Sequence, residues 1–191
     1  MKLQKDFYIR EDVVLIAKEL LGKVLITNFN GAISAGIITE TEAYAGINDR
    51  ASHAFGGRRT ARTETMYATG GTAYVYLCYG IHHLFNVVTN QKDIPHAVLI
   101  RAIKPIEGMD VILKRRKQKE ISNKLSSGPG TLSQALGIQT SHSGENLLGN
   151  KIWIEDRGIN FSDKEIIKSP RIGVDYAGAD ALLPYRFFVN F

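Results

Sequence analysis

The chain has 191 residues, with 24 Lys and Arg against 19 Asp and Glu and a formal net charge of +5. This length suits one domain that buries roughly 70% of the surface of its unfolded chain, so we expect a single domain over residues 1–191. One cysteine excludes a disulfide framework, and the absence of an apolar run of about 18 residues argues against a membrane partner. The polar N-terminus is unlike a signal peptide, which predicts a cytoplasmic protein, and the basic charge balance suggests a polyanionic partner.

The predicted elements are mixed. Residues 11–21 have helical spacing of apolar side chains and stop at Gly22, and two further helices are expected over residues 107–121 and 129–136. Residues 46–71 and 138–150 are predicted as exposed loops. Segments rich in β-branched and aromatic residues predict seven strands, over residues 23–27, 32–42, 72–79, 85–89, 97–103, 151–155 and 185–189. Several connections are too short for crossover helices, which favours a largely antiparallel sheet.

Two carboxylates stand close together in the second predicted strand. Strand alternation places Ile38, Glu40, Glu42 and Tyr44 on one face, where burying the carboxylates would be costly. One interpretation is an edge strand with solvated glutamates, and the other is a pair of carboxyls that flank a glycosidic bond, as in glycosidases. The spacing alone does not choose between them.

His53 lies in a glycine-containing loop, where an imidazole can exchange hydrogen bonds near a pocket, although a lone histidine is more often structural. The other histidines show no HExxH arrangement and no cysteine pair accompanies them, so we expect neither a zinc site nor a zinc-dependent deaminase. Cys78 is expected to be a small buried hydrophobe.

Aromatic and basic residues gather in the same region. Tyr74 and Tyr76 alternate along a predicted strand, and Tyr79 begins a turn at which an exposed ring can act as a wedge between stacked bases. Taken singly, such tyrosines are more often packing residues. Basic side chains form two clusters, one in the 46–71 loop (Arg58, Arg59, Arg62) and one on the predicted helix over residues 107–121 (Lys114, Arg115, Arg116, Lys117, Lys119). A solvated helix face explains the second cluster about as well as DNA does.

Six ordered motifs resemble those of the alkyladenine (3-methyladenine) DNA glycosylase family. They are Glu40-Thr41-Glu42-Ala43-Tyr44, Gly70-Gly71-Thr72-Ala73-Tyr74-Val75-Tyr76, Tyr79-Gly80, Leu99-Ile100-Arg101-Ala102, Ser127-Gly128-Pro129-Gly130-Thr131-Leu132 and Pro170-Arg171-Ile172-Gly173-Val174. The resemblance covers nearly the whole chain. It implies an α+β fold, with a curled antiparallel sheet in one compact domain, and a nucleoid-associated monomer that binds double-stranded DNA without a metal or other cofactor.

The resemblance also implies roles for individual residues. Glu42 would be the general base that activates the attacking water, and Arg101 would help to hold that water. Tyr44 and Tyr76 would sandwich the flipped base, and His53 would reach its edge.

Further residues would select the base and hold the duplex. Asn86 would screen against the exocyclic amine of guanine, and Tyr79 would fill the gap left in the duplex. The backbone of residues 171–178 would line the pocket, and Ile81 stands where better-known members have methionine. The three loop arginines, Arg58, Arg59 and Arg62, are expected to contact phosphates.

These roles predict a monofunctional DNA glycosylase that flips alkylated or deaminated purines of the 3-methyladenine, 7-methylguanine and hypoxanthine class and hydrolyses the N-glycosidic bond. The site motifs contain no lysine that would cut the strand and no obvious acid for a neutral lesion. Two other classes stay open: a domain that senses a base in nucleic acid without cleaving it, and a hydrolase of free nucleosides or sugars that uses Glu40 and Glu42. Release of free purine from alkylated duplex DNA separates all three.

Overall fold

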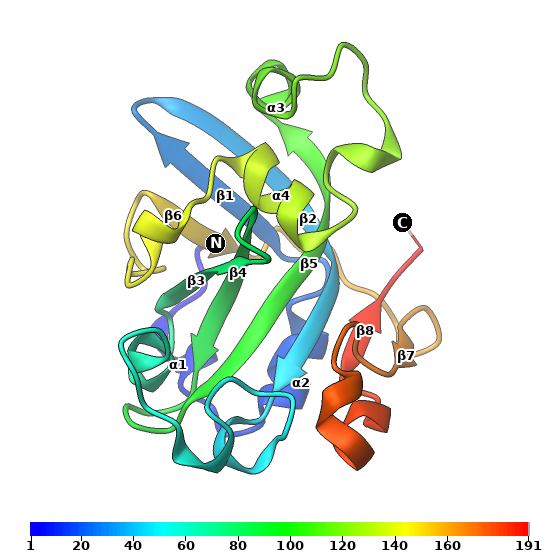
Figure 1. Cartoon of the computed structure of the whole chain (residues 1–191). Coiled ribbons are helices and arrows are strands. Elements are labelled where there is room, and N and C mark those ends of the chain that lie inside the picture. Colours follow the sequence, from blue (N-terminus) through cyan, green and yellow to red (C-terminus); the bar gives the residue numbers. More distant parts are fainter. Residues whose placement is uncertain (191) are drawn as a thin grey trace.

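One antiparallel sheet organises the chain (Figure 1). The structure is a computed structural model that describes residues 1–190, with residue 123 described by its backbone alone. The strands lie in the order β3 (Ala73–Cys78), β4 (His82–Thr89), β5 (His96–Glu107), β2 (Ala32–Tyr44), β1 (Val24–Phe29) and β6 (Ile152–Glu155), with β7 (Ile167–Ser169) and β8 (Arg186–Phe188) continuing beside β2. The sheet is open, and with its helices it confirms the predicted α+β fold in a single compact domain.

β2 is a central strand of this sheet. It pairs with β5 along one side and with β1 and then β8 along the other. The structure therefore excludes the edge-strand interpretation, and the glutamates of β2 must be accommodated inside the protein.

Within residues 1–190, four α-helices accompany the sheet: α1 (Lys5–Tyr8), α2 (Val13–Glu19), α3 (Met109–Arg116) and α4 (Pro129–Leu136). Asp12 caps the start of α2, because its carboxylate accepts a hydrogen bond from the backbone N–H of Leu15, and Gly137 caps the end of α4 with a left-handed φ of 73°. α3 is shorter than predicted because Lys117 turns left-handed, with φ of 52°. The basic residues of its last turn are favourable at a helix C-terminus, so the charge cluster marks the end of this helix.

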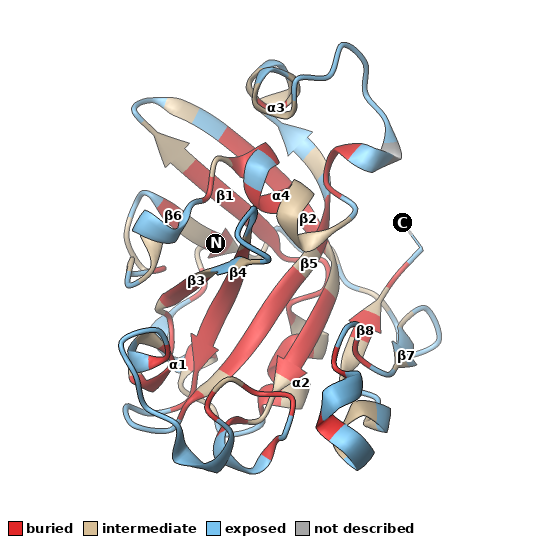
Figure 2. Ribbon diagram, viewed as in Figure 1, coloured by how far each residue is buried: buried red, intermediate tan, exposed pale blue. Residues whose placement is uncertain are grey.

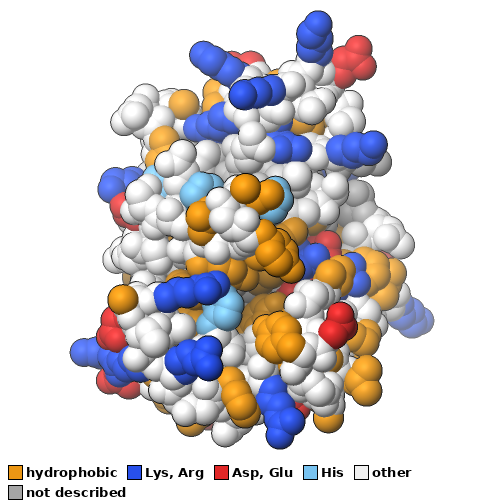
Figure 3. Space-filling view, in the orientation of Figure 1, with side chains coloured by type: hydrophobic (Ala, Val, Ile, Leu, Met, Phe, Trp, Pro, Cys, Tyr) orange, Lys and Arg blue, Asp and Glu red, His pale blue; other side chains and the backbone are white. Residues whose placement is uncertain are grey.

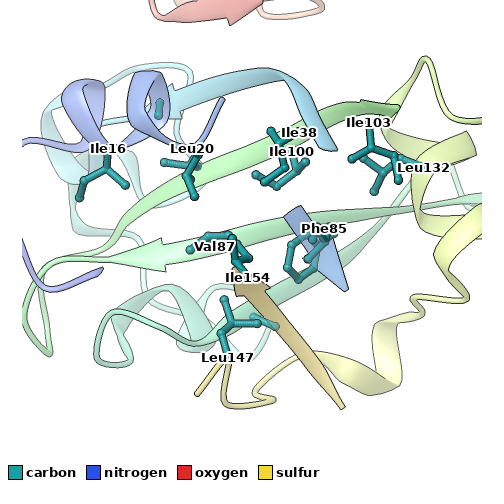
Figure 4. Packing of buried hydrophobic residues seen from close by; sticks show 14 of the residues in the cluster. Ile16, Leu20, Ile38, Phe85, Val87, Ile100, Ile103, Leu132, Leu147 and Ile154 are labelled. Carbon is teal, nitrogen blue, oxygen red and sulfur yellow. The ribbon is translucent and has the colours of Figure 1, made fainter. Parts of the chain in front are cut away.

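The main hydrophobic core covers one face of the sheet. Ile16 of α2, Leu20 directly after α2 and Leu132 of α4 pack with Phe85 of β4 and Ile100 of β5, and all five are fully buried (Figure 4). Figure 2 shows the central parts of β4, β5 and β2 buried, while the loops that surround them contain both exposed and buried stretches. The opposite face of the sheet, called the second face below, lies outside this main core.

A β-bulge separates these two faces within β2. The register with β5 shifts between Ile38 and Glu40 and again between Glu40 and Thr41. Ile38 therefore joins the main core together with Ala43, and the expectation that Ile38 shares a face with Glu40 is wrong. An extra residue reverses the alternation of a strand, and local periodicity does not reveal it.

The segment 46–71 is not the exposed loop that its composition predicts. It contains short 3₁₀ turns at Gly46–Asn48, Phe55–Gly57 and Glu64–Tyr67 and packs on the second face of the sheet. Ala54, Met66 and Tyr67 are buried there against Tyr74 and Val88. In the segment 138–150, Ile138 and Leu147 are likewise buried, so both loop predictions are wrong in these parts.

All seven predicted strands are present, with some ends moved. α1 and β7 were not predicted, because α1 has only four residues and β7 has Ile167 as its single β-branched side chain. Over residues 1–190, the structure contains no helix with the length and apolarity that a membrane span requires.

Candidate active site

A cavity of about 430 Å³ opens on the second face of the sheet. Its floor comes from β3, β4 and β5, and its walls come from the segment 46–71, the first turn of α4 and residues 172–176. Figure 3 shows a hollow near the centre of this face, bordered by hydrophobic side chains and with Lys and Arg side chains on the surface around it. The cavity brings together residues from all six motifs.

Tyrosines and a histidine form one side of the cavity. His53 lies edge-on to Tyr76, with 4.6 Å between ring centroids, and its Nδ1 is 3.0 Å from the hydroxyl oxygen of Tyr74. Burial lowers the pKa of His53 to about 4, with help from the nearby charges of Arg62 and Arg58. His53 is therefore neutral at physiological pH.

Glu42 lies directly behind the cavity wall and is fully buried. Its Oε2 accepts a hydrogen bond of 2.8 Å from the hydroxyl of Tyr44, and its Oε1 accepts one of 2.8 Å from the backbone N–H of Ile172. Nη1 of Arg101 is 3.3 Å from the same Oε1. Tyr44, Arg101 and Ile172 all line the cavity, so the carboxylate of Glu42 lies next to the cavity and is held by three of its lining residues.

Glu40 has a different position from Glu42. Its Oε1 accepts hydrogen bonds from Nε of Arg101 at 2.9 Å and from Nε of Arg186 at 2.5 Å. Glu40 does not line the cavity, and its contacts fix the guanidinium of Arg101, which does. Glu42 thus lies next to the cavity, and Glu40 orients Arg101, which lines it.

Arg171, whose side chain received no role in the sequence analysis, supports the site from behind. Its guanidinium binds Asp49 through two nitrogens, donates to the backbone carbonyl of Ala43 at 2.9 Å and lies 4.9 Å from the centre of the Tyr44 ring. The side chains of Arg171 and Asp49 are both buried. Burial and the adjacent Glu42 raise the pKa of Tyr44 well above its usual value, which leaves its hydroxyl protonated as a donor.

Asn86 lines the cavity from β4 and is almost fully buried. Its Nδ2 donates to the backbone carbonyls of Tyr74, at 3.1 Å, and Leu84, at 3.3 Å. These bonds use both hydrogens of the amide and fix its orientation.

Cys78, at the end of β3, is partly exposed and lines the cavity, so the expectation that it is a buried hydrophobe is wrong. The following residue, Tyr79, is 89% exposed and has φ of 52°, with Gly80 at φ of 73°. A non-glycine residue at positive φ is uncommon, and such backbone strain clusters at functional sites.

The three loop arginines, Arg58, Arg59 and Arg62, differ in their contacts. Arg62 lies 5.3 Å from the centre of the Tyr76 ring, and Arg58 is exposed. Arg59 instead binds Glu64 and Asp93. In the helical cluster, Arg115 donates to the hydroxyl of Ser34 and is partly committed to the fold.

Within residues 1–190, no group of three or more His, Cys, Asp and Glu side chains is arranged to hold a metal ion. The site is an aromatic cavity with an arginine in its wall and a carboxylate behind it. Such a cavity on a basic face suits a hydrolase that acts on a flat, charged base.

Comparison with known proteins identifies this class further. Residues 6–190 match the model of the family described as Methylpurine-DNA glycosylase (MPG). A protein of Chlamydia felis is 46% identical over 189 residues, which cover 98% of this chain and 96% of the relative, and a protein of Clostridium perfringens is 46% identical over 198 residues, covering 100% and 96%. A protein of Bacillus cytotoxicus is 43% identical over 196 residues, covering 98% and 96%. Each of the three is described as "Putative 3-methyladenine DNA glycosylase".

The chain belongs to the methylpurine-DNA glycosylase family. It is a DNA glycosylase, a hydrolase of the N-glycosidic bond that acts on DNA in the repair of alkylation damage.

Proposed function

We propose that this chain excises alkylated and deaminated purines of the 3-methyladenine, 7-methylguanine and hypoxanthine class from duplex DNA. The damaged nucleotide is flipped into the cavity, and a water molecule activated by Glu42 hydrolyses the bond between base and sugar. The observation that carries this proposal is the buried Glu42 carboxylate, held directly behind an aromatic cavity by the three cavity-lining residues Tyr44, Arg101 and Ile172.

The cavity suits a flat purine cation. Tyr44 and Tyr76 present phenol rings, whose electron-rich faces attract a cationic base, and a stacking contact is worth about 1–3 kcal/mol per base. The neutral state of His53 adds no repulsion toward such a base, while its ring nitrogens can still bind the base edge. These features favour 3-methyladenine and 7-methylguanine, which carry a positive charge.

The hydrolysis needs little more than a positioned water. Glu42 takes a proton from the water, the resulting hydroxide attacks C1′, and the electrons of the broken bond pass into the purine. A cationic purine leaves as a neutral molecule, whereas hypoxanthine needs a proton on the ring. Oε2 of Glu42 has a further lone pair beyond its bond to Tyr44, and Arg101 is placed to hold the water beside the carboxylate.

Selection against normal guanine would come from Asn86. Because its amide is bonded to two backbone carbonyls of the sheet, it cannot swing away from an exocyclic amine that enters the cavity. The exposed Tyr79 would fill the gap in the duplex, with Arg58 and Arg62 on the phosphates. Arg59 would contribute less, because Glu64 and Asp93 already neutralise it.

We expect no strand cleavage, because none of the described residues that line the cavity is a lysine. Covalent attack by an amine would be required to convert the product into a nicked strand. The expected product is an intact strand with an abasic site.

The test is release of free purine from matched duplexes that contain one 3-methyladenine, 7-methylguanine or hypoxanthine, with gel analysis of the strand before and after alkaline treatment. The proposal expects purine release, and strand scission only after alkali. Binding without release would indicate a domain that only senses the base, and release from free nucleosides alone would indicate a nucleoside hydrolase. Scission without alkali would contradict the monofunctional mechanism.

A further inference from the structure

A second hollow lies beside the cavity, on the other side of the β3–β4 hairpin. It measures about 910 Å³, and we name it the flanking cleft. His82 and Gly130 line both the cavity and the flanking cleft, so the wall between them is formed by the start of β4 and the first turn of α4. At the hairpin tip, Tyr79 lines the cavity and Ile81 lines the flanking cleft.

The hairpin tip is therefore a ridge with a hollow on either side. Tyr79 is 89% exposed and Ile81 is 70% exposed, and both are apolar enough to enter between stacked bases. A ridge that enters a duplex from the minor groove has one strand on each side of it. The two hollows lie where those strands would pass.

The ionisable side chains that line the flanking cleft are all basic. They are Arg115, Lys151 and the three histidines His82, His83 and His142, and none of the described residues that line the cleft is an aspartate or glutamate. Glu145 pairs with Lys151 at 2.6 Å, but the lysine side chain is 65% exposed and its ammonium group has two further hydrogens to donate, whereas Arg59 is held by two carboxylates. The cleft offers hydrogen-bond donors and positive charge, which suits an anionic ligand.

Two of the histidines are held in one orientation. Nδ1 of His83 accepts a hydrogen bond from the backbone N–H of Thr140, and Nδ1 of His142 accepts one from that of Gln139. A backbone N–H can only donate, so the ring hydrogen of each neutral histidine must be on Nε2. The ring of His142 also stacks on Phe29, with 4.4 Å between centroids and 11° between planes. Both imidazoles are thus fixed as donors.

We propose that the flanking cleft binds the phosphodiester backbone of the strand complementary to the lesion. This inference rests on the proposed function, because the flipped nucleotide assigns the lesion strand to the side of Tyr79. The complementary strand then lies on the side of Ile81, where His83, His142 and Lys151 contact its phosphates. The enzyme would bind a duplex more tightly than a single strand because only a duplex occupies both hollows.

The experiment measures the Kd of the full chain for undamaged duplex and single-stranded DNA of the same sequence, and purine release from the matching lesion duplex. The test protein carries H83N, H142N and K151Q together. Asparagine keeps an acceptor for the backbone N–H of Thr140 and Gln139 but lacks the Nε2 donor. The control is K164Q, which removes one positive charge from an exposed lysine that does not line the cleft.

The triple variant should bind the duplex about tenfold more weakly, while its Kd for the single strand changes less than twofold. The salt dependence of duplex binding should become shallower by about 0.9 in log–log slope for each phosphate that the variant no longer neutralises. The K164Q control should bind both DNAs like the parent, and thermal melting should show that the triple variant is folded.

An equal loss on duplex and single strand, or no loss on the duplex, would overturn the inference. Because binding to undamaged DNA is measured apart from purine release, the two proposals can fail separately. A parent that releases no purine but shows the cleft-dependent preference for duplex would refute only the proposed function. A parent that releases purine while the triple variant binds the duplex normally would refute only the role of the cleft.

Discussion

The two faces of the same sheet show two kinds of design. On the face of the main core, fully buried aliphatic side chains such as Ile16, Ile100 and Leu132 pack together without any charge. On the opposite face, Glu42 is equally buried, but its two oxygens are occupied by a phenol, a backbone N–H and a guanidinium. Burying a charge without partners costs free energy, so the partners of Glu42 on the second face offset that cost. The apolar packing of the first face has no such cost to offset and stabilises the fold.

The largest effect is expected from a substitution on the second face, which tests the role of Glu42 as general base. Glu42→Gln should slow purine excision by about 10²–10⁴-fold, the range expected for loss of a general base, while lesion binding is retained. Single-turnover excision and a binding titration measure the two quantities. Glu40→Gln is the comparison, because Glu40 does not line the cavity and acts only by orienting Arg101, so its loss should be smaller. A Glu42→Gln rate within a few-fold of the parent, with a larger loss in Glu40→Gln, would reverse the two assignments.

The first face should show the opposite pattern. Ile100→Ala removes a fully buried side chain from the main core and should lower the free energy of unfolding by about 2–5 kcal/mol. Urea denaturation measures this loss. Excision per folded molecule should change little, and a large fall in that rate would show that the two faces are not independent.

His53, on the second face, should make the stability of the protein depend on pH. Its pKa is about 4 in the folded protein and near 6.5 in the unfolded chain, so the unfolded state binds more protons between these values. The free energy of unfolding should therefore fall as pH is lowered from 6.5 toward 4, by roughly 2–3 kcal/mol after allowance for partial solvation. Well above pH 6.5, His53 is neutral in both states and contributes no slope.

The measurement is urea denaturation of the parent and His53→Asn at pH 7.5 and 4.5. The other histidines are present in both proteins, so the difference between the two isolates His53. The variant should lose less stability than the parent on acidification. Identical losses would mean that His53 is not held neutral.

The aromatic walls should matter for capture of the base. Tyr44→Ala and Tyr76→Ala should each weaken binding of the flipped base by about 1–3 kcal/mol. Fluorescence of a base analogue placed beside the lesion reports flipping in the complex. Tyr67→Phe is a control, because Tyr67 is a buried residue of the segment 46–71 and does not line the cavity. Normal flipping in both alanine variants would show that these tyrosines only pack.

The smallest effect concerns the rim of the second face. Replacing Arg58 and Arg62 with glutamine should make the log–log salt dependence of DNA binding shallower by about 1–2, with similar losses on lesion and undamaged DNA. Arg59→Gln is the matched control, since Glu64 and Asp93 already bind Arg59, and its slope should change less.

Tyr79→Ala provides the contrast within the same titration. This substitution should lower the affinity for lesion DNA more than the affinity for undamaged DNA, because only a flipped nucleotide leaves a gap to fill. Equal losses on both would remove the wedge role, and an unchanged slope in the double arginine variant would remove the phosphate contacts.

Local patterns in the sequence predicted much of this protein. Strand segments were found because β-branched and aromatic residues cluster within a few positions, and α4 was found because Pro129 and Gly137 mark its ends. The six motifs carried the resemblance, which the family match over residues 6–190 confirms. Such features depend only on residues that are close in the sequence, and the sequence alone is therefore enough to predict them.

Only the tertiary structure decided how the site is built. Glu42 and Ile172 are 130 positions apart, and Asp49 and Arg171 are 122 apart, yet each pair is in direct contact. The bulge in β2, the burial of Glu42 behind the cavity wall and the flanking cleft beyond the hairpin all depend on which distant segments pack together. The local sequence around a glutamate in a strand is the same whether its carboxylate is solvated or is buried beside an arginine. Long-range contacts decide which of the two environments it has.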